Sequence, residues 1–303
     1  MTLKDIEYFY TVAKEKNITK AAAALFIAQP ALSQCIKKLE NEMGIMLFIR
    51  NKAGTTLTKE GECFYAFAQK VLNEKKQLDA QLQDMKNGEG GTVKLGFSGS
   101  QASFILPQIL PAFRTDHPNI EIQLVESLSV ETEKKLIARE IDIAIIPKPI
   151  LFESIEYFEF SRDDMVLLPS RSSEYKRYAY TDEKDGKDYI SMDFFRTEPI
   201  VTTFPGQKTR MITDIIFSRA GITPNIKQMA RNIITVKALA QMDTASALVP
   251  RKLLGTISDR PCFAIPSRYS EPYSYVVAYL KDAYISQAMR NLMNAFFLNK
   301  FSF

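Results

Sequence analysis

Apolar positions near the N-terminus repeat with the period of an α-helix. They are Leu3, Ile6, Phe9, Tyr10 and Ala13, and residues spaced by three or four lie on one face of a helix. Thr2 and Asp5 stand at the spacing of a capping box, in which each side chain bonds the other residue's backbone amide. The pattern predicts a first helix that ends before Asn17.

A second, shorter helix is expected after Asn17. Thr19 is its predicted N-cap, and the alanines at 21–24 form its body. Residues 26–28 then make a tight turn before Pro30, which suits the first turn of a helix because no intrahelical bond needs its missing amide hydrogen there. The spacing predicts two short helices joined by a turn.

The next helix is predicted to place an apolar stripe inward and a small, polar face outward. The stripe is Leu32, Ile36, Leu39 and Met43, and Gly44 can end the helix. The outward residues are Gln29, Ala31, Ser33, Gln34 and Lys37. Glutamine, serine and alanine can contact base edges in the major groove of DNA, and Lys37 and Lys38 are expected on phosphates. The two helices therefore predict a DNA-reading helix-turn-helix.

Strand character follows in two short runs, residues 45–48 and 55–58, around a turn at 51–54. This pattern predicts a β-hairpin wing beside the helix pair. Arg50 and Lys52 at its tip can reach the flanking minor groove or the DNA backbone. Basic residues outnumber acidic ones from residue 29 to residue 59, an excess that suits nucleic acid and that a solvated helix face would also explain.

A long helix is predicted after a cap at Thr58. Its apolar positions step by three and four residues, with one interruption at Lys75, and are Phe64, Ala68, Val71, Leu78, Leu82 and Met85. That period indicates a coiled-coil seam between two subunits. A helix lying on its own domain is the alternative. Within a seam, Lys75 is expected to fix the register.

Strands and helices alternate beyond a glycine-rich joint at residues 87–91. Strands are predicted at 92–97, 120–125 and 141–146, with helices at 104–113 and 131–139, and a second set follows at 200–203, 210–220, 225–229, 234–241 and 247–249. This order predicts parallel strands. Two α/β lobes in sequence favour a cleft that closes on a small ligand.

Composition fits a globular protein of more than one domain. The chain has 303 residues, 46% hydrophobic and 24% charged, and its net charge of +4 is mild for a nucleic-acid binder. No apolar run has the length of a membrane helix, and the N-terminus carries charges where a signal peptide is apolar. We therefore expect a cytoplasmic protein without a membrane partner.

Few residues offer catalytic or metal chemistry. Cys35, Cys63 and Cys262 are isolated, which favours reduced structural thiols over a disulfide or a metal site. The sole histidine, His117, precedes Pro118 in a predicted turn, and no phosphate-cradling loop or metal motif is visible. We expect no catalytic residue, no metal and no cofactor. The alternatives are an enzyme and a solute-binding protein, although the latter leaves residues 1–87 without a purpose.

The stretch from Ile18 to Glu62 resembles the DNA-binding domain of LysR-type transcriptional regulators over its whole length. Matching positions are Phe9, Ala13, Thr19, Ala21, Ala22, Leu25, the run 29–33, Ile36, Leu39, Glu40, Gly44, Leu47, Phe48, Arg50, Leu57, Thr58 and Gly61. Gln34 stands where the family often has a basic residue. By this resemblance the DNA-binding residues are Thr19, Gln29, Pro30, Ala31, Ser33, Gln34, Lys37, Lys38, Arg50 and Lys52.

The resemblance implies a multidomain α+β chain that acts as a sequence-specific transcriptional regulator. A winged helix-turn-helix would span 1–60, a dimerisation helix 61–87, and an effector domain similar to type II periplasmic binding proteins 88–303. Its lobe one would take about 92–165 and 276–303, and its lobe two about 166–275. The implied partners are double-stranded DNA that carries an interrupted inverted repeat and further copies of the chain, in a homodimer or homotetramer. RNA polymerase is a further candidate partner.

An effector site is expected between the lobes. The strand at 92–97 runs directly into a helix, so that free backbone amides face the cleft and favour an anion. By resemblance the effector-binding residues are Ser98, Ser100, Gln101, Ser129, Thr202, Thr203 and Phe204, and the ligand is a small anionic molecule. Residues 242–246 replace the glycine-containing turn that the family usually has at this place.

Overall fold

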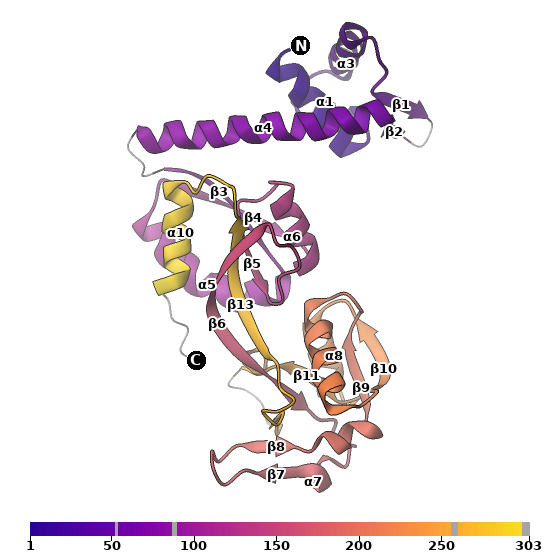
Figure 1. Ribbon diagram of the computed structural model, residues 1–303, viewed down its shortest axis with the longest axis vertical. Helices are drawn as coiled ribbons and strands as arrows, with labels where there is room; N and C mark the ends of the chain where they lie inside the picture. The colour runs from indigo at the N-terminus through magenta and orange to yellow at the C-terminus, as the bar shows by residue number, and fades with distance from the viewer. Residues whose placement is uncertain (52–53, 87–89, 256–259, 299–303) are drawn as a thin grey trace. The chain divides into compact units, whose positions relative to one another are not determined.

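A computed structural model describes residues 1–51, 54–86, 90–255 and 260–298 (Figure 1). The chain divides into two compact units, Met1–Asn87 and Gly88–Phe303. Among the described residues, no helix combines the length and the apolar character that crossing a bilayer requires. Each unit has its own hydrophobic core.

The first unit begins with α1 (Leu3–Glu15) and α2 (Ile18–Ala24). The capping box is confirmed, since Thr2 and Asp5 exchange side chain to backbone hydrogen bonds of 2.7 and 3.3 Å. The prediction of Thr19 as the cap of α2 is wrong. Asn17 caps this helix, because its Oδ1 accepts hydrogen bonds from the amides of Thr19 at 2.9 Å and Lys20 at 3.0 Å.

The helix α3 (Gln29–Met43) has Pro30 in its first turn and ends at Gly44, whose φ is 69°. Leu32, Ile36 and Leu39 are buried as the apolar stripe predicts. The prediction that Met43 faces inward is wrong, since this residue is 37% exposed. It is the last residue of α3 and lies beyond the reach of the core.

The wing consists of β1 (Phe48–Asn51) and β2 (Gly54–Leu57), which pair antiparallel. Strand β1 begins later than residue 45, where the sequence pattern placed its start. The amides of Leu47 and Phe48 donate instead to Oε1 of Glu40, at 2.8 and 3.1 Å, and this carboxylate is 5% exposed. Glu40 thereby ties the end of α3 to the start of the wing.

The long helix α4 (Lys59–Met85) begins at the predicted cap, where Oγ1 of Thr58 accepts a hydrogen bond from the amide of Gly61 at 2.9 Å. Its first half packs on its own unit: Phe64 and Ala68 are buried, and the Phe64 ring meets that of Phe9 at 4.6 Å. Its second half leaves its apolar positions exposed and extends beyond α1, α2 and α3 (Figure 1). The first half thus lies on its own unit, and the coiled-coil seam stays a prediction for the second half.

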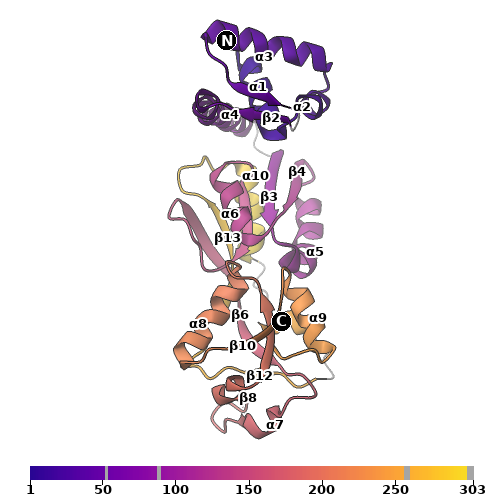
Figure 2. The ribbon, with the colours of Figure 1, turned by 90° about the vertical axis from the view of Figure 1, so that its right-hand side faces the viewer.

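Lobe one of the second unit follows the predicted β-α-β-α-β order. Its elements are β3 (Gly91–Phe97), α5 (Gly99–Asp116), β4 (Ile120–Glu126), α6 (Ser129–Ile137) and β5 (Ile143–Pro147), and β3 pairs parallel with both β4 and β5. Ile143 and Ile145 pack in the core with residues of α5 and α10 (Gln287–Leu298), whereas Ala144 and Ile146 pack with α6. The helices therefore cover opposite faces of this sheet (Figure 2).

Two long strands connect the lobes. β6 (Ile155–Leu168) leaves lobe one, and β13 (Pro272–Leu280) returns antiparallel beside it. Their pairing runs from Pro272 opposite Asp164 to Leu280 opposite Ile155, with a register shift between Tyr275 and Val276. At one end β13 also pairs with β5 of lobe one. At the other end β6 pairs with β11 (Ala247–Pro250) and β12 (Phe263–Ala264) of lobe two.

Lobe two departs from the predicted parallel set. β9 (Pro199–Thr203) and β10 (Asn225–Ala230) are parallel and alternate with α8 (Lys208–Ala220) and α9 (Ile233–Gln241). β11 pairs antiparallel with β6, and the residue before it, Ser246, meets Ile200 of β9 in a single parallel bridge. A set of short elements that the pattern missed completes the lobe: α7 (Tyr175–Tyr178), β7 (Ala179–Thr181), β8 (Asp188–Ile190), η1 (Met192–Arg196) and η2 (Arg251–Leu254). Segments this short show too few periods to be predicted.

The hydrogen bonds of Glu40 allow a direct stability test. Glu40→Ala removes the acceptor of two buried amides and is expected to lower the free energy of unfolding of the first unit by about 2–4 kcal/mol, since each unsatisfied buried group costs about 1–3 kcal/mol. Glu42→Ala, which removes an exposed ion pair with the N-terminus, is the control and should change stability by less than about 1 kcal/mol. Urea denaturation followed by circular dichroism measures both. Equal effects would contradict the role given to Glu40.

Candidate DNA interface and ligand cleft

The N-terminal half of α3 presents a small, polar surface to solvent. Pro30, Ala31, Gln34, Lys37 and Lys38 are exposed, as are Gln29 and Thr19, and Ser33 is half-buried. Nε2 of Gln29 donates to Oγ of Ser33 at 2.7 Å, so the two side chains are held side by side. The first turn of α3 has no acidic residue. A face without bulk or negative charge suits entry into the major groove.

The wing is fixed to the end of α1 through Gly54. The amide of Thr55 donates to the carbonyl of Lys16 at 3.0 Å. A Cβ at Gly54 would lie 2.8 Å from that carbonyl, and its φ of 136° also favours glycine. Of the two tip residues predicted to contact DNA, Lys52 lies outside the described residues, and the side chain of Arg50 lies outside the described side chains.

A cavity of about 770 Å³ lies between the lobes of the second unit. Its walls come from residues 98–99 and 126–130 of lobe one, residues 204–209 and 231–233 of lobe two, and Tyr273 of the returning strand. Four helices begin at these walls: α5, α6, α8 and α9. Helix N-termini carry partial positive charge on free amides, so four partial positive charges lie at the walls of this cavity.

Three of these four N-termini have no side-chain cap. Ser98, Leu128 and Gln207 precede α5, α6 and α8 without bonding a first-turn amide, whereas Oδ1 of Asn232 accepts from the amide of Ile234 at 2.7 Å. The Oγ atoms of Ser98 and Ser129 are 3.3 Å apart and link α5 to α6. The side chain that precedes each of α5, α6 and α8 thus leaves the first-turn amides of its helix unbonded.

A buried lysine adds a full positive charge to this cavity. Lys208 is 2% exposed, and its Nζ donates to the carbonyl of Pro147 at 2.8 Å and forms an ion pair with Glu133. Burial lowers the pKa of Lys208, and the charge of Glu133 opposes that shift. Nearby, the hydroxyls of Thr209 and Tyr273 lie 3.2 Å apart. Glu126 and Arg231 bring one negative and one positive side chain to the lining.

The predicted effector residues fall into three groups. Ser98, Ser129 and Phe204 line the cavity. Thr202 and Thr203 do not line it, and they are buried at 4% and 1% exposure. The side chains of Ser100 and Gln101 lie outside the described side chains.

The prediction missed the polar lining residues Glu126, Ser127, Gln207, Lys208, Thr209, Arg231, Asn232 and Tyr273. Two carried a local signal. Asn232 stands directly before a predicted helix, where asparagine is a common cap. Lys208 stands in the first turn of a helix, where the helix dipole disfavours a basic residue. Its presence there indicates a role other than stabilising the helix.

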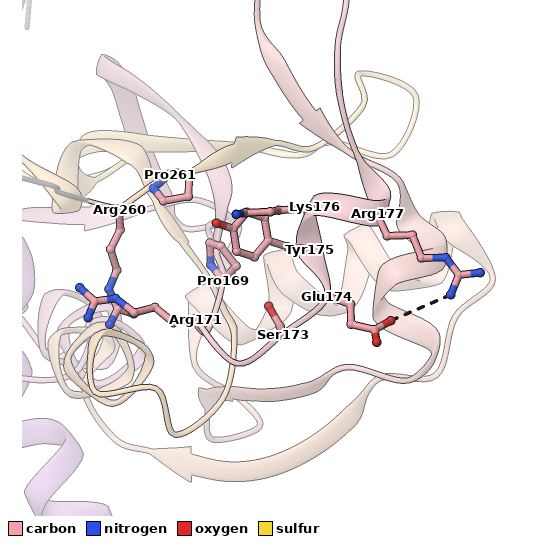
Figure 3. Close-up of a pocket in the computed structure, with 9 residues that line it drawn as sticks. All are labelled: Pro169, Arg171, Ser173, Glu174, Tyr175, Lys176, Arg177, Arg260 and Pro261. Carbon is pink, nitrogen blue, oxygen red and sulfur yellow. Dashed lines mark ion pairs between the residues drawn. The ribbon is translucent and has the colours of Figure 1, made fainter.

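A second cavity, of about 710 Å³, lies within lobe two (Figure 3). Arg260 on its wall donates to the carbonyls of Ala240 and Gln241 and pairs with Asp243. Its positive charge therefore interacts with the C-terminal end of α9. Arg177 points away from the other labelled side chains and pairs with Glu174 (Figure 3). Much of the positive charge here is already satisfied, and the cleft between the lobes is the stronger candidate.

Both segments match known protein families. Residues 3–62 match the bacterial regulatory helix-turn-helix of the lysR family, and residues 86–297 match the LysR substrate binding domain. The chain belongs to the LysR family of transcriptional regulators. The recognition, the fold class and the regulator function predicted from the sequence are thereby confirmed. An enzyme and a solute-binding protein, the two alternatives, find no support in this match.

LysR relatives match most of the chain. The Hca operon transcriptional activator HcaR of Escherichia coli is 30% identical over 82% of this chain and 82% of its own length. The regulator AlsR of Bacillus subtilis is 30% identical over 93% of this chain and 91% of its own. The chain thus matches these regulators through both their DNA-binding and substrate-binding segments.

Solved LysR structures share the fold. Full-length CbnR complexed with its target DNA superposes with a TM-score of 0.64 at 20% identity, covering 97% of this chain and 98% of that one. A full-length OxyR variant from Pseudomonas aeruginosa reaches 0.72 at 20% identity, covering 98% and 94%. Both comparisons establish the arrangement of elements within each unit.

The turn that departs from the LysR pattern is closed by an aspartate. Asp243 adopts a left-handed φ of 61°, which asparagine and aspartate tolerate better than most residues. Its carboxylate accepts a hydrogen bond from the amide of Arg171 at 2.7 Å and pairs with Arg260 at 3.0 Å. These contacts hold Asp243 in the left-handed backbone conformation that a glycine would adopt without strain.

The described residues of this LysR chain bring together few side chains that could bind a metal or act in catalysis. Among the described residues, no group of three histidine, cysteine or acidic side chains is placed to hold a metal ion. His117 is half-buried at the end of α5, with its ring 4.8 Å from that of Phe113. The three cysteines are free thiols.

Proposed function

We propose that this LysR regulator binds upstream DNA as a homodimer or tetramer and is modulated by a small anionic effector between its lobes. One observation carries the proposal: four helix N-termini and a buried lysine meet at the same cavity. Such a site favours a carboxylate or phosphate group. Several kcal/mol of binding free energy would follow from a few charge-assisted hydrogen bonds of about 1.5–3 kcal/mol each.

The DNA contacts proposed for α3 divide by chemistry. The Gln29–Ser33 pair, Ala31 and Gln34 would read base edges, and Lys37 and Lys38 would meet phosphates. Arg50 and Lys52 would extend the contact from the wing, and Thr19 and Pro30 would support it at the turn. CbnR, a structural neighbour, is recorded with its target DNA, which supports the same role for this chain.

The second half of α4 supports a dimer. Leu78, Leu82 and Met85 are 53%, 47% and 80% exposed, which is unusual for a row of large apolar side chains on one helix face. A second α4 would cover this seam and would place two α3 helices on the two halves of an inverted repeat. Lys75, which pairs with Asp79 at 2.5 Å, would fix the register within it.

The regulator would work in the cytoplasm, where chromosomal DNA lies in bacteria. Effector binding would shift an equilibrium between two shapes of the assembly and thereby alter DNA bending and contact with RNA polymerase.

A gel-shift assay with the DNA upstream of its own gene tests the proposed function. The full chain should give a sequence-specific shift that weakens steeply with salt, since phosphate contacts release counterions. A metabolite panel rich in carboxylates and phosphates should contain a compound that alters this shift. Absence of any specific shift, with or without the panel, would contradict the proposal.

Substitutions on α3 should separate base contacts from phosphate contacts. Lys37→Ala should weaken binding to all sequences and reduce the salt slope by about one. Gln34→Ala should leave the slope unchanged and reduce discrimination at one base position by about 1–3 kcal/mol. Fluorescence anisotropy over a salt series measures both. An identical effect of the two substitutions would count against α3 as the reading helix.

Substitutions in the exposed seam should dissociate the dimer. Leu78→Ser with Leu82→Ser removes apolar surface that only a partner subunit would bury, so the monomer should remain folded and operator affinity should fall by at least about tenfold. Lys70→Ser, elsewhere on α4, is the control. Analytical ultracentrifugation gives the oligomeric state. A variant that stays dimeric would exclude this seam as the interface.

A further inference from the structure

We propose that Lys208 and Glu133 form a latch between the lobes, and that an oxyanion of the effector opens it by competing with Glu133 for Lys208. The inference rests on the ligand cleft proposed above and assigns a regulatory role to a single ion pair within it. The occupant is named by its chemistry, a small carboxylate or phosphate.

The pair joins one lobe to the other. Glu133 lies on α6 of lobe one, and Lys208 is the first residue of α8 in lobe two. Lys208 also reaches the carbonyl of Pro147 at the end of β5, again in lobe one. The amide of Leu151 donates to the second oxygen of Glu133 at 2.8 Å and holds that carboxylate in place. Separation of the lobes at this point must therefore break the contacts of Lys208.

The ammonium group of Lys208 retains a donor for a ligand. An ammonium has three N–H donors, and the described residues supply two acceptors, Pro147 and Glu133. The group is 2% exposed, and Lys208 lines the cavity. An oxyanion in the cavity would accept a hydrogen bond from the third N–H of this ammonium.

Stability alone does not explain a buried ion pair here. Desolvation of two charges commonly offsets their attraction, and apolar replacements are often neutral. A lysine in the first turn of a helix is opposed by the helix dipole as well. Three helix N-termini without a side-chain cap from the preceding residue add positive potential around the same cavity, where Glu126 is the one acidic residue in the described lining. An entering anion is therefore attracted toward Lys208, the lining residue that carries the other half of the ion pair.

Opening the latch would change the angle between the lobes. Once an effector oxygen shares the ammonium, the hold of Glu133 weakens, and α8 can move relative to α6. The lobes stay joined through the β6 and β13 ladder, whose register shifts between Tyr275 and Val276. Binding of a small anion thus becomes a change in shape.

The test uses the full chain with inorganic phosphate as the probe, at an ionic strength held constant with sodium chloride. Glu133→Gln removes the competing charge and should bind phosphate at least about tenfold more tightly than the wild type. Lys208→Gln removes the cation and should abolish saturable binding. Glu131→Gln, an exposed position on the same helix, is the matched control and should equal the wild type. Isothermal titration calorimetry measures the dissociation constants.

The opposite signs distinguish a latch from a structural pair. If Glu133→Gln weakens phosphate binding as Lys208→Gln does, or if neither the wild type nor Glu133→Gln shows saturable binding, the proposal is overturned. Should Glu133→Gln fail to fold, Glu133→Asp withdraws the carboxylate by one methylene and should also tighten binding. If an effector still modulates the gel shift of the Lys208→Gln variant, the latch fails while the proposed function stands.

Discussion

The antiparallel pairing of β6 with β13 is the constraint on which the ligand-binding unit depends. The two strands pair from Ile155 to Asp164 on one side and from Pro272 to Leu280 on the other, and they are the backbone connection between the lobes. Lobe one grows on this ladder through β5, and lobe two through β11 and β12. Because both lobes are built on the same two strands, the cleft between them can open or close only as this ladder bends.

The electrostatics of the cleft follow from that arrangement. Each lobe turns helix N-termini toward the other, so amides of α5 and α6 face those of α8 and α9 across the same cavity. Like partial charges repel unless an anion lies between them. In the structure the negative charge of Glu133 forms an ion pair with the ammonium group of Lys208. In the proposed latch, an effector with its own negative group would satisfy the same potential and would thereby couple ligand binding to the positions of the lobes.

Sequence reasoning found the elements that carry local signals. The first three helices, the wing and the β-α-β-α-β order of lobe one follow from periodicity and turn residues, and the LysR resemblance places them in a known architecture. The cap of α2 was misassigned because Asn17 and Thr19 are both good caps two residues apart, and only the helix start decides between them. The antiparallel place of β11 depends on β6, which lies far away in the chain.

The site itself was only partly predictable. Ser98, Ser129 and Phe204 were found by resemblance, whereas Thr202 and Thr203 lie away from the cavity surface. Lys208 was missed because its partner Glu133 lies on another lobe, and no local pattern marks such a pair.

In the proposed function, ligand binding in the cleft and DNA binding through α3 are coupled in the same molecule. The most direct test measures the dissociation constant of an effector from the metabolite panel with and without upstream DNA, and that of the DNA with and without the effector. Linkage requires both ratios to be the same factor, with a value different from one. An effector whose affinity is unchanged by saturating DNA would contradict the claim.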